Sequence, residues 1–297
     1  MRTVLPPSRN FLQLDERYSA YETSQIVILP LPYEATVSYG TGTGQGPDAI
    51  LSASHFVEFF DEESESEICF DQGIATLPPL DFAGRTGKPA VDLIDETVRD
   101  ILEDGKFCVG IGGEHTISEG IIRAHYGRYP DLSILQFDAH SDLREQYEGD
   151  PYSHACVMAR VGEYIPPGQI VQVGIRAQCK EEFHYIHTNN IRTYYAREIR
   201  QGQNVPRWQD NLLRDLGQRV YITLDVDFFD PSIMPSTGTP EPGGFFWDET
   251  LDLIGKIGKE RTIVGFDVVE LAPRMDFSAP DYLVAKLVYK ILSAAFS

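Results

Sequence analysis

Three short segments of the chain carry aspartate and histidine at the spacing of metal ligands. Residues 137–142 read FDAHSD, residues 223–230 read TLDVDFFD, and residues 112–116 read GGEHT. Side chains two positions apart lie on the same side of an extended backbone, so each aspartate-rich segment can direct its ligands to one place. The candidate ligands are His115, Asp138, His140, Asp142, Asp225 and Asp227.

This set of ligands favours a site with two divalent ions. Four carboxylates and two imidazoles in one crevice repel each other unless positive charge compensates them. The set is rich in oxygen and contains no thiolate, which suits Mn²⁺ better than structural Zn²⁺, and Fe²⁺, Co²⁺ and Ni²⁺ are also compatible. Two such ions, roughly 3.5–4 Å apart, can share a water molecule and lower its pKa. The residues therefore predict a hydrolytic centre.

The elements that must position these residues are strands followed by helices. Each ligand segment follows a short apolar run rich in β-branched residues, and such runs are typical of parallel strands that are covered on both faces. The predicted strands are 25–33, 107–113, 132–140, 170–176, 219–230 and 262–273. The predicted helices are 90–104, 117–129, 249–257 and 280–296. This alternation predicts a three-layer α/β/α sandwich, in which the carboxyl ends of the strands form the binding crevice.

Composition limits the size of the fold and the kind of partner. The chain has 297 residues, and 45 acidic against 25 basic residues give a formal net charge of -20. The sequence shows no linker or repeat, so we expect one domain over residues 1–297. The acidic balance disfavours nucleic acid and anionic membranes as partners and suits small cations. The acidic stretch 61–67 is expected to be a solvated loop.

Two further patterns concern location and a glycine-rich loop. The four cysteines show no metal-ligand spacing, and no apolar run approaches the roughly 18 residues of a membrane helix, so we expect a cytoplasmic protein. The stretch YGTGTGQGPDAI at 39–50 lacks the ending of a phosphate-binding loop. We expect it to be a loop that leads into a helix with Pro47 in its first turn, with a possible role at the mouth of the active site.

Together these motifs resemble those of the ureohydrolases, the family of arginase and agmatinase. The matching segments are GGEHT at 112–116, FDAHSD at 137–142, SHA at 153–155, TLDVDFFDPSIMPSTGTPEPGG at 223–244 and FDVVELAP at 266–273. The resemblance implies an α/β/α domain with an eight-stranded parallel sheet, assembled as trimers or hexamers. It also implies two Mn²⁺ per subunit and the hydrolysis of guanidino compounds to urea.

The resemblance assigns a role to each site residue. One metal would be held by His115, Asp138, Asp142 and Asp225, and the other by Asp138, His140, Asp225 and Asp227. Asp138 and Asp225 would therefore bridge the two ions. The catalytic residues would be His154, which passes a proton to the leaving amine, Asp142, which orients the attacking hydroxide between the metals, and Glu270, which grips the guanidinium.

The resemblance also bears on the substrate. Arg144 stands where arginases commonly have an asparagine that reads the substrate's α-carboxylate, and TPEPGG is closer to agmatinases. We therefore expect an agmatinase of polyamine biosynthesis that converts agmatine to putrescine and urea. Glu145, Glu148 and Asp150 could form an acidic mouth for the far amine.

Other functions are kept as alternatives. N1-aminopropylagmatine is the most serious alternative substrate, followed by guanidinobutyrate and arginine. A zinc amide hydrolase of the deacetylase type and a non-catalytic polyamine-binding regulator are less favoured. Two residues depart from the usual pattern: Glu114 stands where many relatives have aspartate, and Cys156 follows the SHA motif. We expect Glu114 to support the metal ligands from behind and Cys156 to be a small buried thiol.

Overall fold

An eight-stranded, all-parallel sheet forms the centre of the protein in a computed structural model that describes residues 2–202 and 207–297. The strand order across the sheet is β2-β1-β3-β8-β7-β4-β5-β6. The strands are β1 (Ile26–Leu31), β2 (Ile74–Thr76), β3 (Phe107–Gly112), β4 (Ser133–Phe137), β5 (Ile170–Val173), β6 (Arg192–Tyr194), β7 (Arg219–Asp225) and β8 (Thr262–Val269). The predicted sandwich with an eight-stranded parallel sheet is confirmed.

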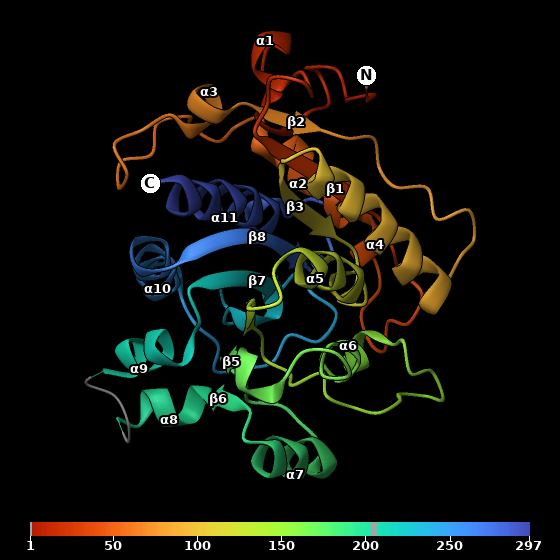
Figure 1. The fold of residues 1–297 in the computed structure, drawn as a ribbon, viewed down its shortest axis with the longest axis vertical. Helices are drawn as coiled ribbons and strands as arrows, with labels where there is room; N and C mark the ends of the chain where they lie inside the picture. The colour runs from red at the N-terminus through yellow and green to blue at the C-terminus, as the bar shows by residue number, and fades with distance from the viewer. Residues whose placement is uncertain (1, 203–206) are drawn as a thin grey trace.

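Helices cover both faces of this sheet (Figure 1). One hydrophobic cluster packs α2 (Gly46–Ser54), α9 (Trp208–Asp215), α10 (Trp247–Glu260) and α11 (Ala279–Phe296) against one face. The other cluster packs α4 (Lys88–Glu103), α5 (Ile117–Arg128), α6 (Val157–Val161) and α7 (Lys180–Asn189) against the opposite face. Shorter helices are α1 (Glu16–Ser19), α3 (Ile68–Gln72) and α8 (Ala196–Arg200). Because both faces are covered, the strands are apolar along nearly their whole length.

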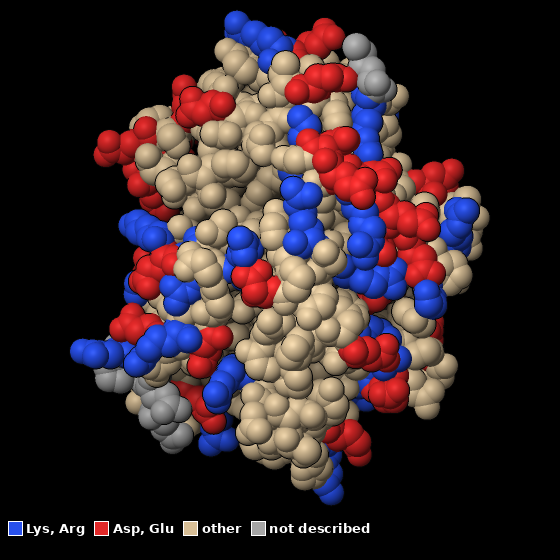
Figure 2. Space-filling model, in the orientation of Figure 1, with Lys and Arg blue, Asp and Glu red and all other residues tan. Residues whose placement is uncertain are grey.

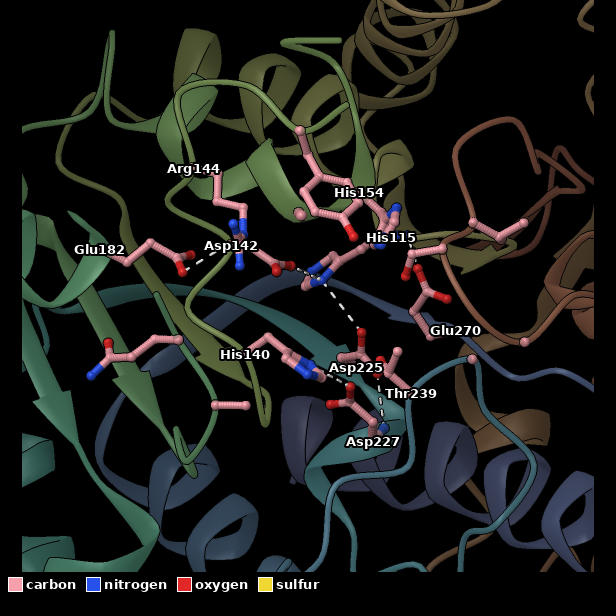
Figure 3. Close-up of a pocket in the computed structure, with 18 residues that line it drawn as sticks. His115, His140, Asp142, Arg144, His154, Glu182, Asp225, Asp227, Thr239 and Glu270 are labelled. Carbon is pink, nitrogen blue, oxygen red and sulfur yellow. Dashed lines mark hydrogen bonds and ion pairs between the residues drawn. The ribbon is translucent and has the colours of Figure 1, made fainter. Parts of the chain in front are cut away.

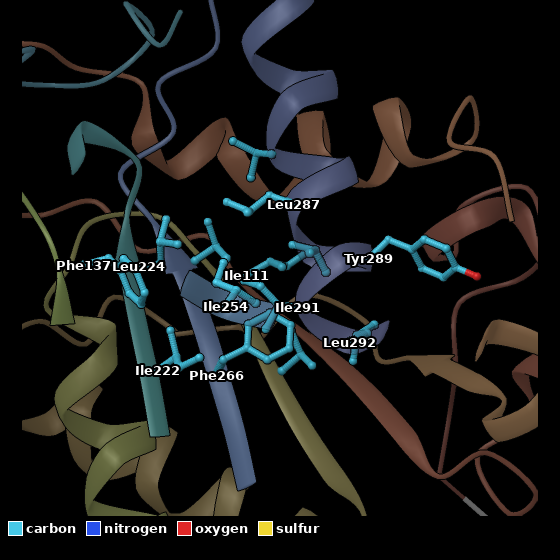
Figure 4. Packing of buried hydrophobic residues seen from close by; sticks show 14 of the residues in the cluster. Ile111, Phe137, Ile222, Leu224, Ile254, Phe266, Leu287, Tyr289, Ile291 and Leu292 are labelled. Atoms are coloured by element: carbon cyan, nitrogen blue, oxygen red, sulfur yellow. The ribbon is translucent and has the colours of Figure 1, made fainter. Parts of the chain in front are cut away.

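The contact between α11 and the sheet shows how tightly these layers pack. Figure 4 shows Leu287 and Ile291 of α11 on the side of the helix that faces the sheet, where Phe266 of β8 and Leu224 of β7 are also drawn. All four side chains are fully buried. Burying a side chain of this size contributes about 1.5–3 kcal/mol. The central strands are therefore held rigidly, and the residues that follow them have a fixed platform.

The strand order brings distant parts of the sequence to one edge of the sheet. β3, β8, β7 and β4 are neighbours in the middle of the sheet, and they run in the same direction. His115 follows β3, Glu270 follows β8, Asp225 ends β7, and Asp138 follows β4. All of these residues therefore lie at the carboxyl edge of four adjacent strands, as expected for an open parallel sheet.

The six predicted strands are all present, but β2 and β6 were not predicted by pattern. Each has only three residues and lies at an edge of the sheet. The four predicted helices correspond to α4, α5, α10 and α11, and α2 begins at Gly46 with Pro47 in its first turn. The prediction of a solvated acidic loop at 61–67 was wrong for Asp61, which is buried and pairs with Lys290 at 2.9 Å. Pairing with a buried ammonium removes the usual objection to burying a carboxylate.

The surface carries both signs of charge. Figure 2 shows acidic and basic side chains interspersed over the face that it presents. On this face, interspersed charges of both signs do not form the basic stripe that favours nucleic-acid binding. Within the described residues, no helix is both long enough and apolar enough to span a membrane.

Candidate metal centre

Three residues from two strand ends form the first group of metal ligands. His115 lies between β3 and α5, and its Nδ1 is 2.9 Å from Oδ2 of Asp142 and 3.2 Å from Oδ2 of Asp138. Asp142 adopts a left-handed backbone conformation, with φ of 52°, which is uncommon outside glycine. All three side chains are buried. Their atoms lie close enough together to bind one ion.

The second group shares Asp138 with the first. Nδ1 of His140 is 2.8 Å from Oδ2 of Asp227 and 3.8 Å from Oδ1 of Asp138. The two oxygens of Asp138 thus face different histidines, since Oδ2 approaches His115. One carboxylate between two ligand groups is the geometry of a bridging ligand. The role of Asp138 as a bridge between two ions stays a prediction.

Asp225 lies beside the first group and not midway between the two. Its Oδ2 is 3.5 Å from Nδ1 of His115. Its Oδ1 accepts a hydrogen bond of 2.8 Å from the main-chain N–H of Asp227. Figure 3 shows Asp225 between His115 and Asp227. All six predicted ligands therefore meet in one place, although the bridging role of Asp225 stays a prediction.

Carboxylates dominate the electrostatics of this cluster. Burial, together with the nearby Asp142 and Asp227 carboxylates, raises the pKa of Asp138 to about 7. Burial alone would lower the pKa of His140, but Asp227 and its neighbours raise it to about 10. Burial also acts to raise the pKa of Asp227, yet the attraction of His140 lowers it to about 2. Without metal, the cluster must hold protons to limit its negative charge.

The nearby Arg176 provides only part of the missing positive charge, and it helps His140 to lower the pKa of Asp227. Arg176 donates hydrogen bonds to the main-chain carbonyl oxygens of Asp227, at 2.5 Å, and Glu241, at 2.9 Å. These bonds tie the loop that carries Asp227 to the segment after β5. Arg176 therefore holds the backbone in place. Because these hydrogen bonds go to carbonyl oxygens, the carboxylate oxygens remain available for cations.

The tautomer of His115 fits a metal ligand. Its Nε2 contacts Oγ1 of Thr223 at 2.9 Å, and that hydroxyl donates to Oδ1 of the buried Asp267 at 2.8 Å. Because the threonine proton goes to Asp267, the hydroxyl must accept from Nε2 of His115. In the neutral ring that binds a metal, Nδ1 is then the unprotonated nitrogen; it is buried and makes no well-formed hydrogen bond within the described residues. A free lone pair among carboxylates suits a divalent cation, so the residues present fit the expected metals.

Glu270 and His154 open onto the same cleft as the ligands (Figure 3). The cleft has a volume of about 260 Å³. Glu270 has a left-handed φ of 67°, and its Oε1 accepts a 2.6 Å hydrogen bond from the main-chain N–H of His115. Burial and the nearby Glu114 raise the pKa of Glu270 well above its usual range. Strained backbone at both Asp142 and Glu270 is a feature that clusters at functional sites.

The far end of the cleft differs from the acidic mouth that was expected. Arg144 and Glu182 line the cleft, with 3.9 Å between Arg144 Nε and Glu182 Oε2. Glu145 is instead 88% exposed and pairs with Arg160. Neither Glu148 nor Asp150 belongs to the lining residues. The prediction that these three residues form an acidic mouth was wrong, because none of them lines the cleft and Glu145 pairs with Arg160 instead.

Sequence reasoning missed Glu182, and it gave the glycine-rich loop only a possible role. Gly40 of that stretch lines the cleft, together with Val37 and Ser38, which come just before it. Glu182 holds the loop that follows Asp142, because its Oε1 accepts a hydrogen bond of 3.0 Å from the main-chain N–H of Leu143. A lone glutamate in the first turn of a helix carries no pattern that distinguishes it from a surface residue. Cys156 is buried as expected, and burial raises the pKa of its thiol to about 12.

Comparison with known proteins adds independent evidence. Residues 24–293 match the model of the arginase family. The N(1)-aminopropylagmatine ureohydrolase of Synechocystis sp. is 38% identical over 290 residues, which cover 96% of this chain and 93% of the relative. The agmatinase of Bacillus anthracis is 37% identical, and the match covers 90% of this chain and 93% of the relative. The crystal structure of agmatine ureohydrolase from Thermoplasma volcanium is 29% identical, with a TM-score of 0.83 and coverage of 94% and 92%.

Proposed function

The chain belongs to the arginase family of ureohydrolases, hydrolases that act on guanidino substrates, and we propose that it releases urea from agmatine. The observation that carries this proposal is the cleft in which two groups of metal ligands lie beside Glu270. The relative from Bacillus anthracis named agmatinase supports the choice of substrate. The products would be urea and putrescine.

The six ligands would hold two ions. His115, Asp138, Asp142 and Asp225 would bind one, and Asp138, His140, Asp225 and Asp227 the other. The family is one of binuclear metal enzymes, and the oxygen-rich set of ligands favours Mn²⁺. When bound, divalent ions lower the pKa of water and supply a nucleophile at neutral pH.

The remaining residues would bind the substrate and move a proton. Glu270 would accept hydrogen bonds from the guanidinium, a charge-assisted contact that holds the planar cation in one orientation. Asp142 would orient the attacking water through its free oxygen. The oxygen of water adds to the guanidinium carbon, the bond from carbon to the tail nitrogen breaks, and His154 passes a proton to the departing amine. Urea keeps the oxygen, and the amine leaves as its ammonium form.

N1-aminopropylagmatine is the second candidate substrate. The relative from Synechocystis sp. bears that name, and it is as similar to this chain as the agmatinases are. Both substrates carry the same guanidino group and differ only in the tail. The cleft leads toward Arg144 and Glu182, so these residues would meet the tail.

Three further expectations stay predictions. We propose that residues 1–297 act as one domain, because both hydrophobic clusters pack on the same sheet. We also propose a homo-oligomer, either a trimer or a hexamer, and a cytoplasmic location. The alternative of a zinc amide hydrolase would use a single ion, and a non-catalytic regulator would release no urea.

Urea release from a panel of guanidines tests the proposed function. The protein is stripped with chelator, reloaded with Mn²⁺ and assayed with agmatine, N1-aminopropylagmatine, guanidinobutyrate and arginine. We expect the highest kcat/KM for agmatine. His115→Ala should abolish turnover, whereas the control Glu145→Gln, at an 88% exposed position, should behave as wild type. Full activity in His115→Ala would overturn the metal assignment, and absence of urea with all four substrates would overturn the function.

A further inference from the structure

Glu114 gathers four hydrogen bonds although it is fully buried beside the metal cluster. Its Oε2 accepts from the main-chain N–H groups of Ala35 and Thr36, both at 2.7 Å. Its Oε1 accepts from the hydroxyls of Thr36, at 2.7 Å, and Thr116, at 2.8 Å. Two main-chain N–H groups and two hydroxyls thus point their hydrogens at the two side-chain oxygens of Glu114, which accept all four bonds.

This arrangement decides where the hydroxyl proton of Thr36 points. The Thr36 hydroxyl donates to Oε1 of Glu114, and its lone pairs remain for other partners. His154 supplies both partners: its main-chain N–H donates to Oγ1 of Thr36 at 3.0 Å, and its ring Nδ1 lies 3.2 Å from the same oxygen. An oxygen whose proton is already committed can accept a hydrogen bond only if Nδ1 carries the hydrogen.

We propose that Thr36, held by Glu114, is a positioning residue that fixes the ring and the tautomer of His154. With Nδ1 as the donor to Thr36, Nε2 is the ring nitrogen left to exchange a proton with the leaving amine. This inference deepens the proposed function and rests on it, since it assigns His154 the proton-transfer step. Ser153 provides a weaker contact, with its Oγ 3.4 Å from Nδ1 of His154.

The placement of the loop makes Thr36 suitable for this task. Thr36 and His154 are 118 residues apart in the sequence, and Glu114 belongs to a third segment. The neighbours Val37 and Ser38 line the cleft, so Thr36 supports the wall behind the site. The loop has a second anchor, because Glu34 accepts from the main-chain N–H groups of Gly42, at 2.9 Å, and Gly44, at 2.8 Å. Removing one hydroxyl should therefore leave the loop in place.

Four variants test the proposal in the Mn²⁺-loaded protein: Thr36→Val, Thr36→Ser, His154→Asn and the double variant Thr36→Val/His154→Asn. Valine keeps the shape and both N–H bonds of the loop but removes the hydroxyl, whereas serine keeps the hydroxyl. We expect Thr36→Val to lower kcat at least about tenfold, a part of the roughly 100- to 10,000-fold that acid–base catalysis contributes. KM and bound metal should stay within about twofold, and Thr36→Ser should retain wild-type kcat.

The double variant separates positioning from general damage to the fold. If Thr36 acts through His154, Thr36→Val should change kcat less than about twofold in the His154→Asn background, because the group it positions is gone. The same loss in both backgrounds, or wild-type kcat in Thr36→Val, would overturn the proposal. Wild-type kcat in His154→Asn would instead overturn the proton-transfer role in the proposed function. Loss of kcat in Thr36→Ser equal to that in Thr36→Val would show that the hydroxyl is not what matters, and would also overturn the proposal.

Discussion

Two buried clusters of charge in this protein are balanced in opposite ways. Lys290 of α11 and Asp61 form an ion pair of 2.9 Å, and Glu62 and Glu63 approach the same ammonium within 3.7 Å. Burial alone would raise the pKa of Asp61, but its bond with Lys290 and the N–H of Glu63 lower it below 3.8. At the metal centre the opposite occurs, and the pKa of Asp138 rises to about 7.

The difference separates a stabilising cluster from a binding cluster. Asp61 finds its counter-charge within the chain, so its ionised form favours the folded state. At the ends of the central strands, His140 gives Asp227 such a partner, whereas at Asp138 burial and the neighbouring carboxylates outweigh the attraction of His115 and raise the pKa. A group of buried acids that the chain compensates only in part is costly in the metal-free protein, and that cost is offset when cations bind. The four predictions below test this contrast.

The largest effect is expected from Asp138→Asn. Loss of the shared carboxylate should weaken binding at both sites and remove several kcal/mol of transition-state stabilisation, which is about 1,000-fold or more in kcat/KM. In the metal-free protein the same change removes a repulsive charge, so the unfolding temperature should not fall. Urea release and thermal unfolding with and without Mn²⁺ measure the two effects. A lower unfolding temperature of the metal-free variant would contradict this explanation, because Asp138 would then stabilise the metal-free fold as Asp61 does.

The next effect is expected from Asp61→Asn. It leaves the ammonium of Lys290, which is only 5% exposed, without its nearest counter-charge, and should cost about 3 kcal/mol of unfolding free energy. The kcat of the folded protein should be unchanged. Adding Lys290→Met should restore part of the lost stability, because no buried charge is then left unpaired. Urea denaturation measures these energies, and a double variant less stable than Asp61→Asn would contradict the explanation.

The third effect is on the pH dependence of stability. Without metal, Asp227 and other groups raise the pKa of His140 from 6.5 to about 10 despite burial. Its contribution to stability is full below pH 6.5 and is lost as the pH rises towards 10. Metal needs the neutral ring, so stabilisation by Mn²⁺ should grow by about 1.4 kcal/mol per displaced proton between pH 7 and pH 8. Calorimetry at fixed free Mn²⁺ measures this gain; a gain that is flat or falls with pH is incompatible with the proposed ligands.

The smallest effect is expected at an exposed ion pair that serves as a reference. Lys88 and Asp92 lie one turn apart on α4, with 2.7 Å between Nζ and Oδ1. Both side chains are exposed, so Lys88→Gln should cost about 0.3–0.5 kcal/mol or less. The cost should shrink further in high salt. A cost as large as that of Asp61→Asn would mean that burial does not explain the difference between the two pairs.

The sequence predicted the metal centre better than its surroundings, and the reason is physical. The ligands belong to short motifs at strand ends, such as Asp138 and His140, so local spacing and the strand pattern predict both their type and their place. The pair of Asp61 with Lys290 joins residues 229 positions apart, and nothing local in an acidic loop indicates a buried partner. The same holds for Thr36 and His154.

The two edge strands of the sheet also could not be predicted from the sequence pattern. β2 and β6 have three residues each, too few for an apolar run to stand out. Arg144 was identified as a position that matters for the substrate, but its partner Glu182 comes from the start of α7. The residues expected to meet the substrate tail are brought together by contacts between distant segments. The metal ligands, in contrast, lie within short motifs that can be recognised in the sequence.

The most direct test of the central claim is the number of Mn²⁺ ions bound per chain when activity returns. Chelated protein is titrated with Mn²⁺, and bound metal and urea release from agmatine are measured on the same samples. We predict that activity becomes maximal at two ions per chain. Maximal activity at one ion per chain, or urea release by the fully chelated protein, would contradict the account.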